Sequence, residues 1–495
     1  MRPSHITFLA EPLASRFANY LVNKTCSFGH QPHKTHNLVE ELELTNRSFL
    51  FLDSHWHCMM PPERRKSGRH RSSIDRLSNL PKNVINSILM RLPLQDALMT
   101  SILSKKWRYK WCSLPQLTLD DELWEETRAL LSPSIKFTKI LYQILTLHSG
   151  PLTKFTLSIS ALRKYLKINS LIYFLSRNDI QDLVLKFSEW NRYRLPPSFF
   201  ACSQLRHLTL QNCVICPPPA FKGFDMLNSL NLCDVTISSK LLESLISCSP
   251  LLEKLVLKIS DTADHLQINA PNLRSFDFTG CIKYISLRSV PLLSKLSLPH
   301  QKSIEESEKC DFDKFFQLLS ALEHLYLANG SDQFLVTTAA EIPRRLSSPL
   351  NYLKRFNITL RGLADFFVAL CLIQSSPYIQ DIEMEVYCLR YYILEKLEAS
   401  NEVDEVLASF SDVTLNHLRT VQLGGVEGIK VELQLIKLLL TKSPMLVRML
   451  IDPSRGDNYD ARRDKIIAAT TIQRASSKAN VVVSDAYEDY RDMTP

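Results

Sequence analysis

Residues able to bind a metal gather near the start of the chain. Seven of the thirteen histidines lie within residues 1–73. Five of them and two cysteines form a set whose nitrogen and sulfur atoms are ligands that zinc prefers: Cys26, His30, His33, His36, His55, His57 and Cys58. Structural zinc sites use paired ligands at short spacings, and only His55 and His57 make such a pair, with no CxxC beside it. We therefore interpret residues 1–73 as a disordered or poorly ordered, basic, histidine-containing extension, and expect no metal and no cofactor.

The rest of the sequence contains no motif typical of a catalytic site. The chain has 11 glycines and contains neither GxGxxG nor GxxxxGKS/T, the loops that bind phosphates. Cys213 and Cys216 form a CxxC, but no second pair accompanies it, so we interpret it as part of a repeat rather than as a zinc or redox site. No spacing indicates a nucleophile with its base or a paired acid and base. We expect a protein that is not an enzyme.

The charge and hydropathy patterns bear on partners and location. The net charge is +8, and basic residues cluster at Arg64–Arg71. This cluster is open to three readings, which are a nuclear localisation signal, a nucleic-acid patch and solvated linker charge. Nucleic acid is not an expected partner, because no interleaved aromatics or basic fold motif accompany the cluster. Nor is a membrane, because no apolar run approaches 18 residues. The twelve cysteines lack a regular framework, which favours a reducing compartment, and we expect the nucleus and/or the cytoplasm.

One apolar pattern recurs from about residue 150 to the C-terminal region. An apolar residue is followed by a second one three positions on and a third two positions later. Twelve copies occur, with starts 20 to 39 residues apart. They begin at Leu152, Ile180, Leu205, Leu227, Leu252, Leu273, Leu293, Leu322, Leu353, Ile379, Leu418 and Leu446. Most of the intervals fall in or near the range of leucine-rich repeats.

Each copy predicts a short strand followed by a helical or irregular segment. The last two apolar residues lie two apart and therefore face the same, buried side of a strand. Between the strands, segments such as Lys240–Ile246 have helical spacing and end at a proline, here Pro250. One unit cannot bury its apolar side alone, whereas stacked units share a continuous core. We predict an α/β solenoid, an irregular leucine-rich-repeat horseshoe over residues 116–414.

The residues between the buried ones would form an open polar face. Alternation places on it His207, Thr209, Gln211, Ser229, Asn231, Lys254, Lys258, Ser275, Asp277, Lys295, His324, Tyr326, Arg355, Asn357, Asp381, Glu383 and Glu385. A basic middle and an acidic end suit a protein of mixed charge, although a merely solvated face explains the pattern about as well. The candidates for binding a protein substrate, whose identity is unknown, are His207, Lys254, Lys258, Lys295, Tyr326, Arg355, Asp381 and Glu383.

The stretch Leu77–Trp111 predicts three short helices. Pro81 suits the start of the first helix, and Ile85, Ile88 and Leu92 follow as one apolar stripe. Pro93 ends that helix, and a second follows over Asp96 to Leu103. Ser104 is a suitable N-cap for a third helix carrying Trp107 and Trp111. So small a unit exposes apolar surface and needs a partner.

These residues resemble an F-box, the segment that docks a substrate receptor onto the Skp-family adaptor of a cullin–RING ubiquitin ligase. Leu114-Pro115 after the tryptophans is similar to the plant class that carries leucine-rich repeats. Lys82 and Lys110 depart from the family pattern in ways that would weaken adaptor binding without removing it. The alternative is a helical hairpin that caps the repeats. The resemblance implies that the adaptor-binding residues are Leu80, Pro81, Ile85, Ile88, Leu92, Pro93, Leu94, Ala97, Leu103, Trp107 and Trp111.

Residues Leu415–Asp485 resemble the FBD domain that follows the repeats in plant F-box proteins. The residues themselves predict a strand to Leu423, a turn at Gly424-Gly425, and a helix with Leu433, Ile436 and Leu440 on one side. A strand Leu446–Ile451, a helix Ile466–Ser476 and a strand Val481–Val483 follow.

The resemblance divides the chain into an extension (1–73), an F-box (74–115), repeats (116–414), an FBD-like block (415–485) and a tail (486–495). It implies the substrate-recognition subunit of an SCF-type ligase, whose partners are the Skp-family adaptor and, through it, cullin and RING subunits. The alternative is a leucine-rich scaffold that acts without a ligase.

Overall fold

A computed structural model describes most of the chain from residue 80 onward. The described residues are 80–102, 106–120, 133–159, 168–299, 311–328, 342–386, 408, 410, 412–455 and 458–484. They belong to two compact units, Met1–Ile180 and Gln181–Pro495, which we call unit 1 and unit 2. The histidines and cysteines of residues 1–73 that were considered as zinc ligands, the basic cluster Arg64–Arg71, and Leu103 and Ser104 lie outside the described residues.

Unit 1 opens with two short helices joined at a proline. Helix α3 is Lys82–Leu89 and α4 is Leu94–Met99, followed by a 3₁₀ turn, η1, at Thr100–Ile102. Pro93 occupies the N-cap of α4, as expected of a residue that cannot continue α3. The expected apolar stripe is rotated: Ile85 and Leu89 are buried, whereas Ile88 and Leu92 are half-buried.

The tryptophans do not lie on the regular third helix that the sequence predicts. Residues 106–110 form turns, and a 3₁₀ helix, η2, spans Trp111–Ser113. The amide of Lys110 donates to the carbonyl of Trp107 at 3.1 Å, and that of Leu114 donates to Trp111 at 3.1 Å. These bonds join residues three apart, which is the tighter 3₁₀ pattern. Both indole side chains are nonetheless buried, so this end of the unit is held by packing.

The rest of unit 1 begins the parallel sheet. Strand β1 (Gln116–Leu119) pairs in parallel with β2 (Lys154–Ser158), and helices α6 (Pro133–Leu147) and α7 (Ile168–Ser176) contact each other. Strand β2 is the first predicted copy. Strand β1 is an additional one that the sequence reading missed, although Leu114, Leu117 and Leu119 have the same spacing.

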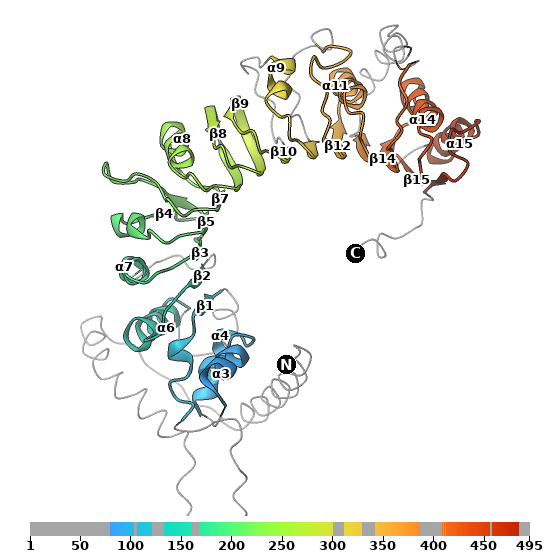
Figure 1. Ribbon diagram of the computed structural model, residues 1–495. Helices are drawn as coiled ribbons and strands as arrows, with labels where there is room; N and C mark the ends of the chain where they lie inside the picture. Colours follow the sequence, from blue (N-terminus) through green and yellow to red (C-terminus); the bar gives the residue numbers. More distant parts are fainter. Residues whose placement is uncertain are drawn as a thin grey trace, which may run out of the picture. The chain divides into compact units, whose positions relative to one another are not determined.

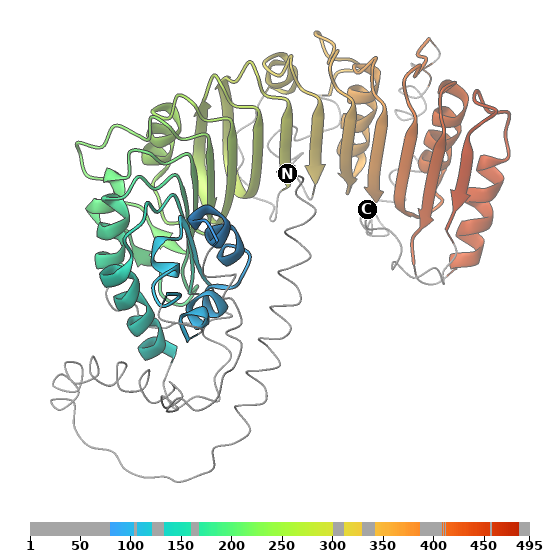
Figure 2. The same ribbon diagram turned by 60° about the horizontal axis from the view of Figure 1, so that its bottom comes forward.

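Unit 2 is built on one parallel sheet whose strands follow chain order (Figures 1 and 2). Its described strands are β3 (Asp182–Lys186), β5 (His207–Gln211), β7 (Ser229–Cys233), β8 (Lys254–Asn269), β9 (Ser275–Ser289), β10 (Lys295–Pro299), β11 (His324–Ala328), β12 (Arg355–Leu360), β13 (Asp381–Val386), β14 (Thr420–Val426), β15 (Arg448–Pro453) and β16 (Asn480–Val483). A separate pair joins β4 (Tyr193–Arg194) to β6 (Cys213–Val214), near the 3₁₀ helix η3 (Pro197–Ala201).

The strand register places equivalent residues of successive copies side by side. Leu208 of β5 lies opposite Leu230 of β7, and Leu210 lies opposite Leu232, so buried leucines stack from strand to strand. All twelve predicted copies form strands, and the expected repeated α/β fold with a shared core is confirmed. Burying a leucine side chain completely stabilises the folded state by about 1.5–3 kcal/mol. A single copy would leave these leucines exposed, so it needs neighbouring copies to be stable.

The helices of unit 2 lie on one side of its sheet, and no described segment of unit 2 covers the other side (Figures 1 and 2). They are α8 (Ser239–Ser247), α9 (Phe312–Gln317), α11 (Leu363–Gln374), α14 (Lys430–Lys442) and α15 (Tyr459–Thr470). Helix α8 matches the predicted segment and begins where Ser238 Oγ accepts a hydrogen bond from the amide of Leu241. Among the described residues, no helix has the length and apolar character that crossing a membrane requires.

The C-terminal block departs from the sequence prediction at three points. Strand β14 runs through Gly424-Gly425 instead of turning there, and its register with β15 shifts after Leu423. In α14, Ile436 and Leu440 are buried as predicted, but Leu435 and Leu439 are buried with them and Leu433 is only half-buried, so the buried side is shifted from the predicted one. The last helix begins at Tyr459 and ends at Thr470, not at 466–476. Strand β16 (Asn480–Val483) agrees with the prediction.

Candidate functional site

Two rows of side chains cross the uncovered face of the sheet in unit 2. Register aligns the first exposed position of each strand from β9 to β15, and we call this the first row: Ser275, Lys295, His324, Arg355, Asp381, Thr420 and Arg448. The second row lies two residues further along each strand: Asp277, Ser297, Tyr326, Asn357, Glu383, Gln422 and Leu450. Both rows point away from the helices, because strand residues two apart share a face.

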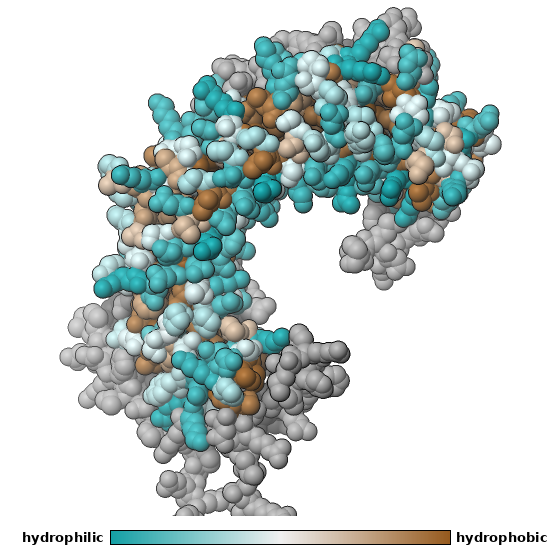
Figure 3. Space-filling model, viewed as in Figure 1, coloured by the Kyte–Doolittle hydropathy of each residue, from teal (hydrophilic) through white to brown (hydrophobic). Residues whose placement is uncertain are grey.

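A hollow of about 540 Å³ lies over these rows. Every member of both rows lines it, together with buried residues between them, such as Phe356 and Ile382. The side chains that face it are polar in all but Leu450. Figure 3 shows hydrophilic residues along the uncovered face of the strands of unit 2.

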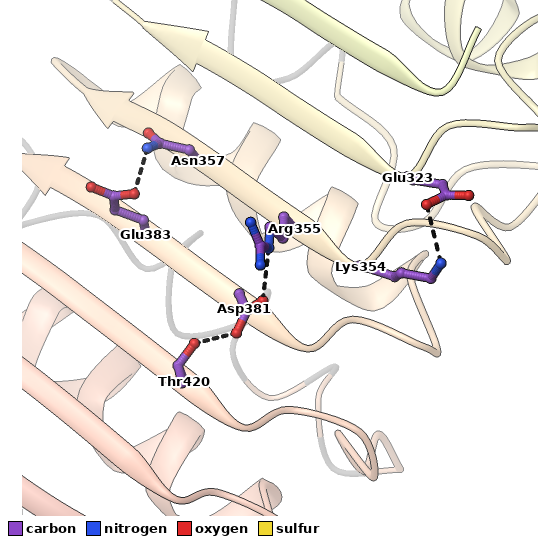
Figure 4. A network of polar contacts seen from close by, with 7 residues as sticks. All are labelled: Glu323, Lys354, Arg355, Asn357, Asp381, Glu383 and Thr420. Atoms are coloured by element: carbon purple, nitrogen blue, oxygen red, sulfur yellow. Dashed lines mark hydrogen bonds and ion pairs between the residues drawn. The ribbon is translucent and has the colours of Figure 1, made fainter. Parts of the chain in front are cut away.

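Neighbouring strands exchange polar contacts inside the hollow (Figure 4). Arg355 Nε donates to Asp381 Oδ2 at 3.1 Å, and the hydroxyl of Thr420 donates to the other oxygen of Asp381. In the second row, Asn357 Nδ2 donates to Glu383 Oε2 at 2.7 Å. These contacts are solvent-exposed, so each stabilises the fold by no more than about 1 kcal/mol. Their main effect is to fix where the charged groups lie.

A further ion pair lies just before the strands. Lys354 Nζ is 3.1 Å from Glu323 Oε2, across the starts of β12 and β11 (Figure 4). Neither residue lines the hollow. The pair therefore joins two copies next to the site without taking part in it.

The electrostatic environment differs between two residues of one strand. Burial lowers the pKa of His324, and the nearby charges of Lys295 and Arg355 lower it further. Burial raises the pKa of Tyr326, and the carboxylates of Glu385, Glu383 and Asp277 raise it further. His324 and Tyr326 are therefore both neutral at pH 7, the histidine among positive charges and the tyrosine among negative ones.

The hollow brings together five of the eight residues predicted to bind a substrate: Lys295, Tyr326, Arg355, Asp381 and Glu383. The other three do not line it. His207, Lys254 and Lys258 are exposed on β5 and β8, at positions in register with the two rows or just beyond them. His207 Nε2 lies 3.8 Å from Asp182 Oδ1 of the neighbouring strand.

Sequence reasoning missed the far end of the site. Thr420, Gln422, Arg448 and Leu450 line the hollow but were not among the expected face residues. The signal was present, because the copies that begin at Leu418 and Leu446 have the same alternation. The list of expected face residues stopped at β13, because the strands after it lie in the block that resembles an FBD domain.

A second candidate surface lies on the short helices of unit 1. Of the residues predicted to bind an adaptor, Pro81 and Pro93 are exposed, and Leu80, Ile88 and Leu92 are half-buried. Met90 adds to this apolar surface with 42% of its area exposed. The rest of the described set is buried in the core of the unit: Ile85, Leu94, Ala97, Trp107 and Trp111.

Backbone hydrogen bonds join these helices to the first strands. The amide of Ser149 donates to the carbonyl of Cys112 at 2.9 Å, and the amide of Thr153 donates to Pro115 at 2.9 Å. The His148 ring also bonds to the carbonyl of Leu114, with Nε2 at 2.9 Å. A Cβ on Gly150 would meet the backbone of Ser113 at 2.8 Å, so glycine permits this close approach. The segment 112–115 is thus fixed against the loop that leads into β2.

Cysteines do not form a site in the described part of the chain. Burial raises the pKa of Cys213 to about 12, which makes its thiol a poor nucleophile and metal ligand. Among the described residues, no group of three or more histidine, cysteine or acidic side chains is placed to hold a metal ion.

Comparison with known proteins agrees with this architecture. The F-box domain model matches residues 77–118, which contain the short helices, and a model of the LRR repeats of the FBD-associated F-box protein At5g56370 matches residues 168–314. The chain is 32% identical over 428 residues to the F-box/FBD/LRR-repeat protein At1g13570 of Arabidopsis thaliana, covering 83% of this chain and 98% of that protein. The chain belongs to the F-box/FBD/LRR-repeat protein family.

Two further relatives are less similar to this chain than At1g13570 is. The putative F-box/FBD/LRR-repeat protein At4g03220 of Arabidopsis thaliana is 24% identical over 483 residues, covering 82% of this chain and 95% of its own length. F-box/LRR-repeat protein 25, from the same plant, is 27% identical over 203 residues and covers 40% of this chain and 73% of its own length. The resemblance to an F-box with leucine-rich repeats is therefore confirmed.

Proposed function

We propose that this protein is the substrate-recognition subunit of an SCF-type cullin–RING ubiquitin ligase. The observation that carries the proposal is the F-box match over residues 77–118, on helices that keep an accessible apolar surface. The F-box binds a Skp-family adaptor, which connects it to the cullin and RING subunits. The repeats bind a target protein. The chain itself is not catalytic, and the ligase acts by raising the effective concentration of the target lysine near the charged enzyme.

The adaptor-binding residues act in two ways in this proposal. The accessible ones, Leu80, Pro81, Ile88, Leu92 and Pro93, touch the adaptor and lose apolar surface to water on binding. The buried ones keep those residues in position by filling the core beneath them: Ile85, Leu94, Ala97, Trp107 and Trp111. We assign Leu103 to the same F-box by the family resemblance.

We propose the domain division F-box 74–115, repeats 116–414 and an FBD-like block 415–485, between an extension (1–73) and a tail (486–495). Strands β14, β15 and β16 continue the register of the repeats, so the FBD-like block extends the same sheet. The protein acts in the nucleus and/or the cytoplasm, and binds neither membranes nor nucleic acid.

Adaptor binding tests the proposal directly. The full-length chain is mixed with a purified plant Skp-family adaptor, and the Kd is measured by calorimetry. We expect Leu80→Ala combined with Ile88→Ala to weaken binding at least tenfold, which corresponds to about 1.4 kcal/mol. Tyr142→Ala is the matched control, because it removes an exposed large side chain from α6, outside the F-box match.

The alternative is a leucine-rich scaffold that acts without a ligase. It predicts no adaptor binding by the wild-type chain, or binding that the paired substitution leaves unchanged. Either result, obtained with protein whose unfolding transition is intact, rejects the ligase proposal.

A further inference from the structure

The hollow in unit 2 has the form of a long groove across the strands. Seven neighbouring strands, β9 to β15, contribute to its lining. At about 4.8 Å per strand, six spacings give a length of roughly 29 Å. Each strand offers only two exposed positions to it, which are about 7 Å apart. A ligand that uses the whole groove must therefore be long and thin.

Two cations lie toward the ends of the first row. The side chains of Lys295 of β10 and Arg448 of β15 have no ion-pair or hydrogen-bond partner among the described residues, and five strand spacings put these residues roughly 24 Å apart. The charge between them is largely balanced, because Arg355 is paired with Asp381. A drug-sized molecule would reach one of the two cations but not both.

Carboxylates occupy the second row. The carboxylate of Asp277 of β9 has no hydrogen-bond or ion-pair partner among the described residues, and Glu383 of β13 uses only Oε2 for Asn357. Glu385 lies two residues beyond Glu383 and is exposed. The groove therefore has a positive side toward the starts of the strands and a negative side toward their ends.

Neutral groups lie in the middle of the groove. His324 and Tyr326 are in register with Arg355 and Asn357 of the next strand and line the hollow. The imidazole of His324 and the hydroxyl of Tyr326 can donate and accept hydrogen bonds while uncharged, so they do not require a charged ligand group. Such groups suit the amide and carbonyl groups of a polypeptide backbone.

An extended peptide matches this arrangement. Its successive side chains point to opposite sides, so every second residue faces the first row and the residues between face the second row. At about 3.4 Å per residue, the distance from Lys295 to Arg448 corresponds to about six to eight residues.

We propose that the groove binds an extended segment of a target protein that lies across β9–β15, with acidic side chains toward Lys295 and Arg448 and basic side chains toward Asp277 and Glu383. This inference rests on the proposed function, because it specifies the part of the target that the repeats bind. The groove would select targets by the alternation of charge along the segment, not by its net charge.

Three labelled peptides of about ten residues test the proposal with the full-length chain. In the first, glutamate and lysine alternate. The second has the same composition with all glutamates before all lysines. The third places like charges three and four residues apart, so that a helical peptide would carry its glutamates on one side and its lysines on the other. All three have the same net charge, so non-specific attraction is equal, and fluorescence anisotropy gives each Kd at two salt concentrations.

We expect the alternating peptide to bind at least tenfold more tightly than the other two, and the difference to shrink at high salt. Lys295→Glu with Arg448→Glu, or Asp277→Lys with Glu383→Lys, should remove the preference. Lys437→Glu is the control, because it changes the charge of an exposed residue on α14, on the covered side of the sheet.

Three results would overturn the inference: equal affinity for all peptides, tightest binding of the helix-patterned peptide, or a preference that the groove substitutions leave unchanged. Adaptor binding is measured on the same preparations. If the adaptor binds and the peptides are not distinguished, the inference fails and the ligase proposal stands. If the adaptor does not bind, the ligase proposal fails independently of the groove.

Discussion

Arg355 and Asp381 are paired across neighbouring strands in the middle of the first row, with Arg355 Nε 3.1 Å from Asp381 Oδ2. The pair removes one positive charge from the centre of the groove and leaves Lys295 and Arg448 as its unpaired cations among the described residues. Thr420 bonds to the other oxygen of Asp381, so that carboxylate is held from both sides. The charge pattern of the groove thus depends on a carboxylate as well as on its cations.

Replacing this carboxylate should change binding without changing the fold. Asp381→Asn releases Arg355 and raises the charge of the first row by one. Because the pair is solvent-exposed, the free energy of unfolding should change by less than about 1 kcal/mol. Affinity for the peptide with alternating charge should increase severalfold at low salt, as measured by anisotropy. Lys354→Ala breaks the ion pair outside the hollow and is the control, which should leave peptide affinity unchanged.

Buried and accessible residues of the F-box should respond differently to truncation. Ile85→Ala leaves a cavity in the core and should lower the free energy of unfolding by about 2–5 kcal/mol. Leu80→Ala removes a half-buried side chain and should cost less stability while weakening adaptor binding. Denaturant unfolding and calorimetry separate the two effects. A Leu80→Ala protein as unstable as Ile85→Ala would contradict the assignment.

Glu432 should make stability depend on pH. Burial raises the pKa of its carboxyl from 4.5 to about 7, although the amides of Ile429 and Gly428 donate to it. Between these values the folded carboxyl holds a proton that the unfolded chain has released. Its contribution to stability is therefore complete below pH 4.5 and is lost as the pH rises through 7.

Glu432→Gln keeps a neutral side chain of the same size that can accept the same amide hydrogen bonds. The variant should lose this pH dependence between 4.5 and 7 and, at pH 8, exceed the wild type in stability by up to about 3 kcal/mol. Denaturant unfolding across the pH range measures both. Glu385→Gln, at an exposed carboxyl, is the control. A stability that changes between pH 4.5 and 7 by the same amount in the wild type and in Glu432→Gln would contradict the assignment.

The two glycines in β14 should differ sharply in their tolerance of a side chain. Gly425 has φ +67°, and a Cβ there would lie 2.3 Å from the carbonyl oxygen of Val386. Gly425→Ala should lower the free energy of unfolding by at least about 1–2 kcal/mol, since strain and steric overlap add. At Gly424 the nearest atom would be Glu385 Cγ at 3.7 Å, an ordinary contact. Gly424→Ala should therefore be tolerated, and thermal unfolding of the two variants provides the comparison.

The repeat was predictable because it depends on a strong, local signal. Apolar residues spaced three and then two positions apart predict a strand at each copy, and the structure has a strand at every predicted copy. Alternation then placed Lys295, Tyr326, Arg355, Asp381 and Glu383 on one face. It could not show that these five line a common hollow, because that depends on which strands are neighbours.

Features that depend on a close approach of distant residues were not predictable. Gly424-Gly425 resembles a turn in sequence, but the chain continues as a strand because Gly425 fits against Val386 of the neighbouring strand. The spacing of Trp107 and Trp111 suggests a helix, whereas the structure has turns and a 3₁₀ helix that bury both rings. In both cases tertiary packing overrides the local pattern.

The hydrogen bonds from Ser149 and Thr153 to the carbonyls of Cys112 and Pro115 have a mechanical consequence. They hold residues 112–115, which include the end of η2, against the residues that lead into β2. An adaptor that held the helices would also set the direction in which β1 and β2 leave them. Inserting one residue between Ser113 and Pro115 would shift these carbonyls out of reach, and the first strands would no longer keep their angle to the helices. If the proposed ligase forms, the length of this segment therefore sets in part the direction in which the first strands leave the adaptor-bound F-box.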